Sequence, residues 1–305
     1  MRRFLIKGFI FFLAVASISY GVDYMIQEGI KTSNYREVTK WNEVITGGID
    51  AEILIVGSSR ALVHFDCEYI EKVTGKTCYN LGFDGTTYPL QKLMLELYLS
   101  RNQKPQELIW SLDFHSFSFS SDFYGFEQLI PYFDNLYIKG ILALHKTPYY
   151  QFFIPLFRYS YNPKMKVIGL YSFLGNYERE PVIIKGYRHQ DKVWDNTFNT
   201  FVSKNPQGEK VSFDKGLFQD FEHYAAKLNS TLKISWIITP YYVDAQKIFT
   251  NSNEIIELYS NSAKSLKIPF VDKTKDSIIF SKAYFYNGIH LNVKGVQNFS
   301  NSLFQ

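Results

Sequence analysis

The chain has 305 residues, of which 46% are hydrophobic and 20% are charged, and this balance allows one large domain or two small ones with a substantial core. The net charge of +4 is small and the Lys and Arg residues are scattered, which argues against the basic stripe that a nucleic-acid-binding surface needs. Aromatic residues make up 18% of the chain, and we interpret most of them as core residues, although aromatic faces can also stack on sugars.

The N-terminus carries the clearest compositional feature. Two arginines, Arg2 and Arg3, precede an apolar stretch from Phe4 to Val22 in which Lys7 is the one charged residue. The stretch is long enough to span a bilayer, and the arginines before it predict a cytoplasmic N-terminus with the rest of the chain outside. We therefore expect residues 1–23 to be an uncleaved membrane anchor. The alternative is a cleaved signal peptide, with Ala14-Val15-Ala16 as a candidate cleavage site inside the apolar stretch.

Residues 24–50 are predicted to form a helical stalk or entry segment that ends at Gly47-Gly48. The folded domain is expected over residues 51–305, and it begins with Ile53-Leu54-Ile55-Val56, which is typical of a short buried strand. A helix over about 60–74, a strand over 76–81, a helix over 89–100 and a strand over 107–113 follow. This alternation predicts a parallel sheet with right-handed crossovers.

The chain contains two cysteines. Cys67 falls early in the helix after Ser59, and Cys78 falls in the strand that returns. The rise of a helix and of a strand allows the two residues to come level, so a disulfide can form outside the cytoplasm. The sequence does not show whether the side-chain geometry closes.

The periodic pattern fails between about residues 115 and 210, where aromatic residues are frequent. We interpret this segment as an insertion, partly helical, that caps the site or forms a packing layer. Its most polar cluster, Lys185-Gly186-Tyr187-Arg188-His189, offers Tyr187 and Arg188 as candidate contacts to an anionic or sugar substrate. The alternating pattern then resumes, with helices over 213–229, 253–266 and 293–303 and strands over 232–240 and 268–272.

Polar residues follow several of these strands. Ser59, Gly85 and Asp113 come after strand ends, and His290 lies on the loop after the last strand, so strand polarity places all four in one crevice. A serine becomes a nucleophile when a base takes its proton, and backbone N–H groups of Ser59 and Gly85 are placed to hold an oxyanion. The alternative for Ser59 taken alone is a helix cap. The chain lacks the Gly-x-Ser-x-Gly elbow of α/β-hydrolases.

These residues resemble those of the SGNH (GDSL-like) hydrolase superfamily. The similar motifs are Gly57-Ser58-Ser59, the loop Asn80-x-Gly82-x-x-Gly85-Thr-Thr, and the terminal His290-Leu-Asn. The Gly-Ser-Ser version behind one membrane anchor is similar to an exported subgroup that includes teichoic-acid D-alanylation and polysaccharide O-acetylation proteins, which work beside membrane-bound O-acyltransferases. The resemblance covers about residues 50–100 and 230–305. It implies a three-layer α/β/α fold with a parallel, flavodoxin-like sheet of about five strands.

The resemblance assigns roles by position. Ser59 would be the nucleophile, Gly85 an oxyanion donor and His290 the base, with Arg60 and Asn80 beside the substrate. Two departures from the family pattern matter.

The first departure is Asn287, which stands three residues before His290, where the family has its acid. An amide does not stabilise an imidazolium as a carboxylate does, and the equivalent change in serine proteases costs about 10⁴ in rate. Either a Ser-His dyad operates, or Asp272 or Asp276 supplies the carboxylate, or catalysis is weak or absent.

The second departure is in the third family block, where the family has Gly-x-Asn-Asp and this chain has Leu112-Asp113-Phe114-His115. Asp113 or His115 would take the place of the missing amide donor. As purely structural alternatives, Asp113 could cap the next segment and His115 could be a core histidine.

The sequence therefore predicts an anchored, extracytoplasmic serine esterase or O-acyltransferase that acts on acyl esters of a cell-envelope polysaccharide or related glycan. Hydrolysis and transfer use the same residues and are not separated by the sequence. The alternatives are a catalytically degenerate fold that binds a glycan or an acyltransferase partner, and a soluble cytoplasmic esterase in which residues 4–22 are a core helix. No metal-ligand cluster or phosphate loop is visible in the sequence, so we predict no cofactor and no metal.

Overall fold

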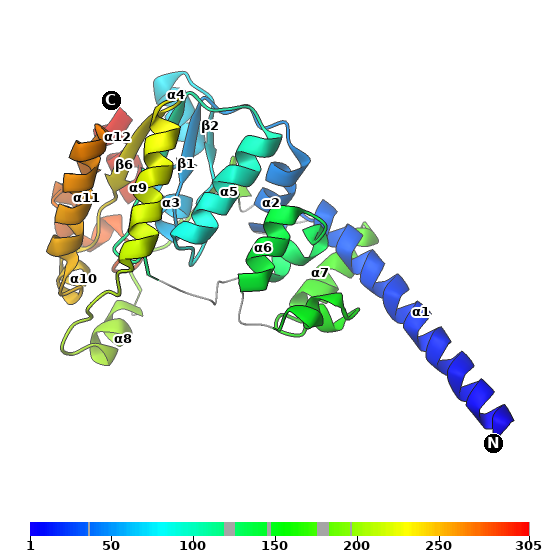
Figure 1. The fold of residues 1–305 in the computed structure, drawn as a ribbon. Helices are drawn as coiled ribbons and strands as arrows, with labels where there is room; N and C mark the ends of the chain where they lie inside the picture. The colour runs from blue at the N-terminus through cyan, green and yellow to red at the C-terminus, as the bar shows by residue number, and fades with distance from the viewer. Residues whose placement is uncertain (36, 119–125, 145–147, 176–182, 196, 305) are drawn as a thin grey trace. The chain divides into compact units, whose positions relative to one another are not determined.

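The computed structural model describes residues 1–35, 37–118, 126–144, 148–175, 183–195 and 197–304. The chain divides into two compact units (Figure 1). The anchor unit, as we name it, comprises Met1–Glu43 and Ser121–Pro181, and the sheet unit comprises Val44–Ser120 and Val182–Gln305. Of the insertion predicted over 115–210, residues 119–125, 145–147, 176–182 and 196 lie outside the described residues, and the remainder is divided between the two units.

The sheet unit is built on five parallel strands in the order β2-β1-β3-β6-β7. The strands are β1 (Ile53–Val56), β2 (Cys78–Asn80), β3 (Glu107–Ser111), β6 (Lys233–Ile238) and β7 (Phe270–Asp272). This is the flavodoxin-like order, in which the chain leaves β1 toward one edge for β2 and returns past β1 to β3. The predicted fold class is confirmed. The crevice expected of such a sheet therefore opens beyond the carboxyl ends of β1 and β3.

Helices connect the strands, as parallel pairing requires. They are α3 (Ser59–His64), α4 (Cys67–Thr74), α5 (Tyr88–Arg101), α8 (Thr197–Lys204), α9 (Lys215–Asn229), α10 (Val243–Ile248), α11 (Ser252–Leu266) and α12 (Val293–Phe304), with short 3₁₀ turns η4 (Ser277–Phe280) and η5 (Lys282–Tyr284). A hairpin of β4 (Ile183–Ile184) and β5 (Tyr187–Arg188) lies within the predicted insertion.

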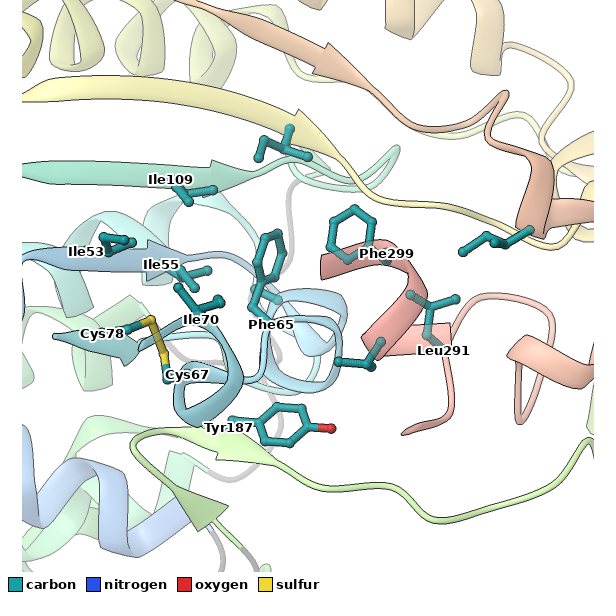
Figure 2. Close-up of a cluster of buried hydrophobic side chains, with 14 of the residues drawn as sticks. Ile53, Ile55, Phe65, Cys67, Ile70, Cys78, Ile109, Tyr187, Leu291 and Phe299 are labelled. Carbon is teal, nitrogen blue, oxygen red and sulfur yellow. A yellow bond between two sulfur atoms is a disulfide. The ribbon is translucent and has the colours of Figure 1, made fainter. Parts of the chain in front are cut away.

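Strand β1 shows why the sheet is buried on both sides. All four of its residues are enclosed, which is the continuous apolar pattern of a strand covered by helices on both faces. Ile53 and Ile55 point to one face, where they meet Phe65 of the segment that joins α3 to α4, Ile70 of α4 and Phe299 of α12 (Figure 2).

The opposite face of the sheet is closed by aromatic rings. Trp110 of β3 lies 4.9 Å from Phe221 of α9, measured between ring centroids, and Trp236 of β6 lies 4.7 Å from the same ring. Tyr88, the first residue of α5, packs on Trp110 at 6.0 Å. The sheet is thus the middle of three layers, with α5 and α9 crossing it in Figure 1.

The helix predicted over about 60–74 is in fact two helices. Phe65 adopts an extended conformation after α3, and the Asp66 carboxylate then accepts hydrogen bonds from the N–H groups of Glu68 and Tyr69 as the N-cap of α4. A capping aspartate favours a helix start over a continuous helix, which explains the break. Cys67 opens α4 and forms a disulfide with Cys78, with 5.1 Å between their Cα atoms (Figure 2).

The anchor unit is helical. It contains α1 (Arg2–Thr32), η1 (Phe126–Tyr132), α6 (Leu136–Leu144), η2 (Tyr149–Phe153), η3 (Phe157–Tyr159) and α7 (Lys164–Phe173), and most of α2 (Glu37–Thr46). Helix α1 is long and apolar enough to cross a membrane, and none of its most apolar stretch is buried by the protein. A signal sequence has the same properties.

Helices α1 and α7 cross at two glycines. A Cβ on Gly29 would lie 1.7 Å from the carbonyl oxygen of Gly169, and a Cβ on Gly169 would lie 2.4 Å from that of Ile26. Only glycine permits so close an approach of two helix backbones.

Candidate active site

Ser59 lies where the strand order reverses. It is the first residue of α3 and follows β1 after Gly57 and Ser58. A Cβ on Gly57 would meet the side chain of Ala61 at 2.7 Å and the carbonyl oxygen of Ser111 at 2.8 Å, so glycine is required for the tight turn. Ser58 is the N-cap of α3, and its Oγ accepts a hydrogen bond from the Arg60 N–H. The cap is therefore Ser58, which leaves the Ser59 hydroxyl for other contacts.

His290 reaches this hydroxyl from the loop before α12. Its Nε2 lies 2.9 Å from the Oγ of Ser59, and its Nδ1 lies 3.2 Å from the Oδ1 of Asn287. Asn287 Oδ1 also accepts the backbone N–H groups of Ile289 and His290, at 3.0 and 2.9 Å. These donors fix the oxygen of the amide on the His290 side, so the hydrogen-bond network assigns a proton to Nδ1 and leaves Nε2 to accept from Ser59. The three residues have the geometry of a nucleophile, a base and an orienting group.

The surroundings keep His290 neutral. Burial, with the positive charge of Arg60 adding to it and Asp84 opposing it, lowers the pKa of His290 to about 3. Tyr286 stacks on the imidazole, with ring centroids 5.3 Å apart and planes within 8°. At neutral pH the imidazole can therefore accept a proton, but an imidazolium here lacks the adjacent carboxylate that usually stabilises it.

The two carboxylates considered as substitute acids are used elsewhere. Asp272 Oδ1 accepts the N–H and hydroxyl of Thr274, at 2.9 and 2.6 Å. Asp276 caps η4 and pairs with Lys273 at 3.3 Å. The position next to His290 Nδ1 is held by Asn287.

A buried polar layer supports the turn. Arg60 is buried, with its guanidinium 3.2 Å above the ring of Tyr241 and hydrogen bonded to Thr239 Oγ1 at 2.7 Å. Its Nε lies 3.5 Å from Asp113 Oδ1, and Asp113 Oδ2 accepts the hydroxyl of Ser58. Burial lowers the pKa of Arg60 to about 10, so the side chain remains charged at neutral pH. Arg60 and Asp113 line the cavity described below. Arg60 Nη2 and Asp113 Oδ2 have hydrogen-bond partners in the protein, whereas Arg60 Nη1 has none among the described residues.

His64 is a site residue that the sequence did not single out. It is fully buried, its Nε2 accepts the N–H of Leu291 at 2.9 Å, and its Nδ1 donates to Thr239 Oγ1 at 2.8 Å. Burial, with Arg60 and His290 adding to it, lowers the pKa of His64 well below its usual value. His64 thus ties α3 to the residue after His290. His64 lies four residues after Arg60, which puts both side chains on one face of the helix, and this spacing could have indicated from the sequence that His64 belongs to the site.

A cavity of about 420 Å³ opens beside Ser59. Its polar lining includes Gly85, which has φ of +65°, and His115, which is exposed and lies 3.7 Å from Glu209. Its apolar lining comes from Phe198 and Phe201 of α8, Tyr241, Ala245, Phe249 and Ile289. Helix α8 belongs to the segment predicted to cap the site, but Phe198 and Phe201 were not predicted as site residues, because aromatic residues there look like packing residues in the sequence.

Three predicted substrate contacts do not line the cavity. Asn80 is buried, and its amide group donates to the carbonyls of Ala61 and Phe65 and accepts the N–H of Gly82. An enclosed amide must satisfy its own hydrogen bonds, which explains the placement.

The other two residues belong to the β4–β5 hairpin. Tyr187 packs in the core cluster (Figure 2), and Arg188 forms a two-bond ion pair with Asp84. The hairpin is held against the sheet, where the Asn80 N–H donates to the Lys185 carbonyl at 3.0 Å. Tyr187 and Arg188 therefore contact other parts of the protein and do not face the cavity as predicted.

Comparisons with known proteins do not identify a family for this chain. No family model matches the chain, and no curated protein matches it. One solved structure, a Streptococcus pneumonia protein provisionally described as a platelet activating factor, aligns over 96% of each chain with a TM-score of 0.38 and 13% identity. A similarity of this size says nothing about activity. Among the residues that the structure describes, no three His, Cys, Asp or Glu residues are grouped so that they could hold a metal ion.

Proposed function

We propose that the chain is a membrane-anchored serine esterase or O-acyltransferase of the SGNH type. The observation that carries this proposal is the 2.9 Å contact between Ser59 Oγ and His290 Nε2, at the mouth of a cavity beyond the ends of β1 and β3. A serine hydroxyl paired with a neutral histidine, at a helix N-terminus that favours negative charge, suits acyl transfer.

The proposed chemistry uses the pair of Ser59 and His290. Ser59 Oγ attacks the carbonyl carbon of the ester while His290 Nε2 takes the hydroxyl proton, and the oxyanion faces the backbone N–H groups of Ser59 and Gly85. When the tetrahedral intermediate collapses, the bond to the alcohol oxygen breaks and His290 returns the proton to that oxygen. Water or a sugar hydroxyl then attacks the acyl group on Ser59, with His290 acting as base again. Water gives hydrolysis and a sugar gives transfer.

The proposed substrate is an acyl ester of a cell-envelope glycan, and a membrane-bound O-acyltransferase is the proposed partner. The support is the motif resemblance together with helix α1, which could hold the sheet unit on the outer face of a membrane. The disulfide between Cys67 and Cys78 is consistent with a location outside the cytoplasm, because disulfides persist in oxidising compartments.

A fluorophosphonate probe tests the proposal on the full chain in lipid nanodiscs. We expect the wild type to be labelled, and Ser59→Ala and His290→Ala to lose labelling. Ser203→Ala, an exposed serine on α8, is the matched control and should be labelled like the wild type. A folded wild type that resists labelling would refute an activated serine.

Asn287 supports a second candidate, a catalytically degenerate fold that binds a glycan or an acyltransferase. The amide orients His290 but does not neutralise its charge. In Asn287→Asp the new carboxylate should raise the pKa of His290 and raise the rate by up to about 10³–10⁴ if the protein is a weakened esterase. The acidic limb of its pH-rate profile should move to higher pH. If neither form cleaves an ester or reacts with the probe, the binding role is favoured.

A further inference from the structure

The cavity beside Ser59 is too large for the smallest acyl groups. Its volume of about 420 Å³ falls in the usual range for small-molecule sites. An acetyl group has three heavy atoms, and at roughly 30 Å³ for each, the share of a water molecule in the liquid, it would fill about 90 Å³. Most of the cavity would then remain for another part of the substrate.

The walls of this remaining space are apolar. Phe198 and Phe201 lie three residues apart, hence on one face of α8, and both line the cavity. Ala245 of α10, Phe249 after it, and Ile289 complete this apolar wall. Gly288 allows the wall to close, because a Cβ there would lie 2.7 Å from the ring of Phe198 and 2.8 Å from Ala245.

Most polar side chains around the cavity already have protein partners. Ser58 donates to Asp113 Oδ2, and Arg60 Nη2 donates to Thr239 while the guanidinium stacks on Tyr241. Arg60 Nη1, which has no hydrogen-bond partner among the described residues, and Asp113 Oδ1 are enclosed, with no more than a trace of accessible surface, so neither is open to a ligand without rearrangement. Thr86 Oγ1 is 3.2 Å from the carbonyl of Gly57 and 3.1 Å from that of Phe83. A sugar ring in this space would lose water without gaining equivalent hydrogen bonds, which is unfavourable, whereas an alkyl group would gain from leaving water.

We propose that the cavity binds an apolar group of several carbons attached directly to the scissile ester, so that the preferred substrates are medium-chain esters and not acetate esters of small alcohols. This inference rests on the proposed esterase function. A glycan would then be the remaining half of the ester or the acyl acceptor, outside the apolar wall.

Each methylene group that the cavity buries should raise kcat/KM by about fourfold, because burial of a methylene is worth about 0.8 kcal/mol. Ethyl octanoate has six methylenes more than ethyl acetate, and even half of that burial predicts a kcat/KM at least about 50-fold higher. The apolar group can belong to the acyl half or to the alcohol half of the ester. The isomers ethyl octanoate and octyl acetate separate these two sources.

The experiment measures hydrolysis of ethyl acetate, ethyl octanoate and octyl acetate by the full chain in nanodiscs, below the solubility limit of each ester. A preference for ethyl octanoate assigns the cavity to the acyl chain, and a preference for octyl acetate assigns it to the alcohol. Phe201→Ser should reduce the rate on the preferred ester at least about tenfold and so lower its preference over ethyl acetate. Val202→Ser, on the next residue of α8 but outside the cavity lining, is the control.

Two outcomes overturn the inference in distinguishable ways. If the fluorophosphonate probe labels Ser59 but all three esters react at similar rates, the apolar-group inference fails and the esterase function stands. If the probe does not label and no ester is cleaved, the proposed function fails, and the inference fails with it.

Discussion

In the sheet unit, Leu54, Trp110 and Trp236 are fully enclosed between helices, whereas in the anchor unit many large apolar side chains are exposed. Phe11 of α1 is 71% exposed, Leu136 is 81% exposed and Tyr150 is 63% exposed. Soluble proteins rarely leave so many such residues in contact with water. The sheet unit therefore buries most of its large apolar side chains itself, whereas the anchor unit leaves many of its own exposed, as expected if part of it contacts a membrane or a protein partner.

Asp23 would mark the surface of the bilayer if α1 spans a membrane. It is the first carboxylate after the apolar stretch of α1, and it is buried, accepting the Leu156 N–H at 2.8 Å and lying 3.5 Å from Arg158. Charged groups are avoided in the bilayer core, so in a membrane-spanning α1 this level of the helix would lie at or beyond the membrane surface. Phe153 and Phe157, both exposed and close in sequence to Leu156, would then lie at the depth where aromatic residues concentrate.

The largest expected effect is on the core of the sheet unit. Trp110→Ala removes a fully buried indole whose Nε1 donates to Gln91 at 2.9 Å, and it should lower the free energy of unfolding by about 3–5 kcal/mol. The matched change Tyr150→Ala in the anchor unit should stay within about 0.5 kcal/mol, because that ring is exposed. Urea unfolding of the full chain, followed by circular dichroism, measures both. Equal losses would remove the contrast between the units.

The next effect should stay within the anchor unit. Gly29→Ala places a methyl group where the Gly169 carbonyl lies, and overpacking of this kind costs about 1–3 kcal/mol. Gly140→Ala on α6 meets nothing within 4 Å and is the control. We expect faster proteolysis within residues 126–173 of Gly29→Ala only, with unchanged labelling of Ser59. Loss of labelling would show that the units depend on each other.

The strands and helices of the sheet unit could be predicted from the sequence because short local patterns of residues determine them. Apolar runs bounded by glycine and proline mark strands, and the polarity of parallel strands brings their carboxyl ends together wherever the helices pack. For that reason the approach of His290 to Ser59 could be predicted across more than two hundred residues of chain. The break between α3 and α4 was missed because the apolar spacing continues through Asp66, and only the cap interrupts the helix.

The packing of the anchor unit and the aromatic wall of the cavity depend on long-range contacts, which leave no recognisable pattern in the sequence. Helix α7 packs on α1, which is more than a hundred residues earlier in the chain, through a crossing of Gly29 and Gly169. A lone glycine in a helix gives no indication of its partner. Phe198 and Phe201 are likewise indistinguishable from core aromatics until α8 is seen beside Ser59.

A third, smaller effect is the response of the sheet unit to acid. Burial lowers the pKa of both His290 and His64 in the folded chain below the usual 6.5, to about 3 for His290. Below about pH 6.5 the unfolded chain therefore binds protons that the folded chain does not, and for His290 this difference extends to about pH 3. Stability should therefore fall as the pH falls through this window, by up to about 1.4 kcal/mol per pH unit for each histidine.

Urea midpoints measured at pH 7 and pH 5 test this response. His64→Gln should be less stable at pH 7 but should lose less between the two values. An unchanged pH dependence in His64→Gln would mean that this histidine is not kept neutral by the fold.

The smallest perturbation tests the depth of the anchor unit. Phe157→Trp exchanges one exposed aromatic residue for another and should change stability by less than about 0.5 kcal/mol. If α1 spans the bilayer and Asp23 marks its surface, this tryptophan should lie at the interface, and lipids brominated near the headgroup should quench it more than the wild-type tryptophans. Val193→Trp, at a position 85% exposed in the sheet unit, serves as the control and should show no added quenching. Equal quenching at both positions would contradict a membrane contact specific to the anchor unit, and its exposed aromatic residues would then require a protein partner instead.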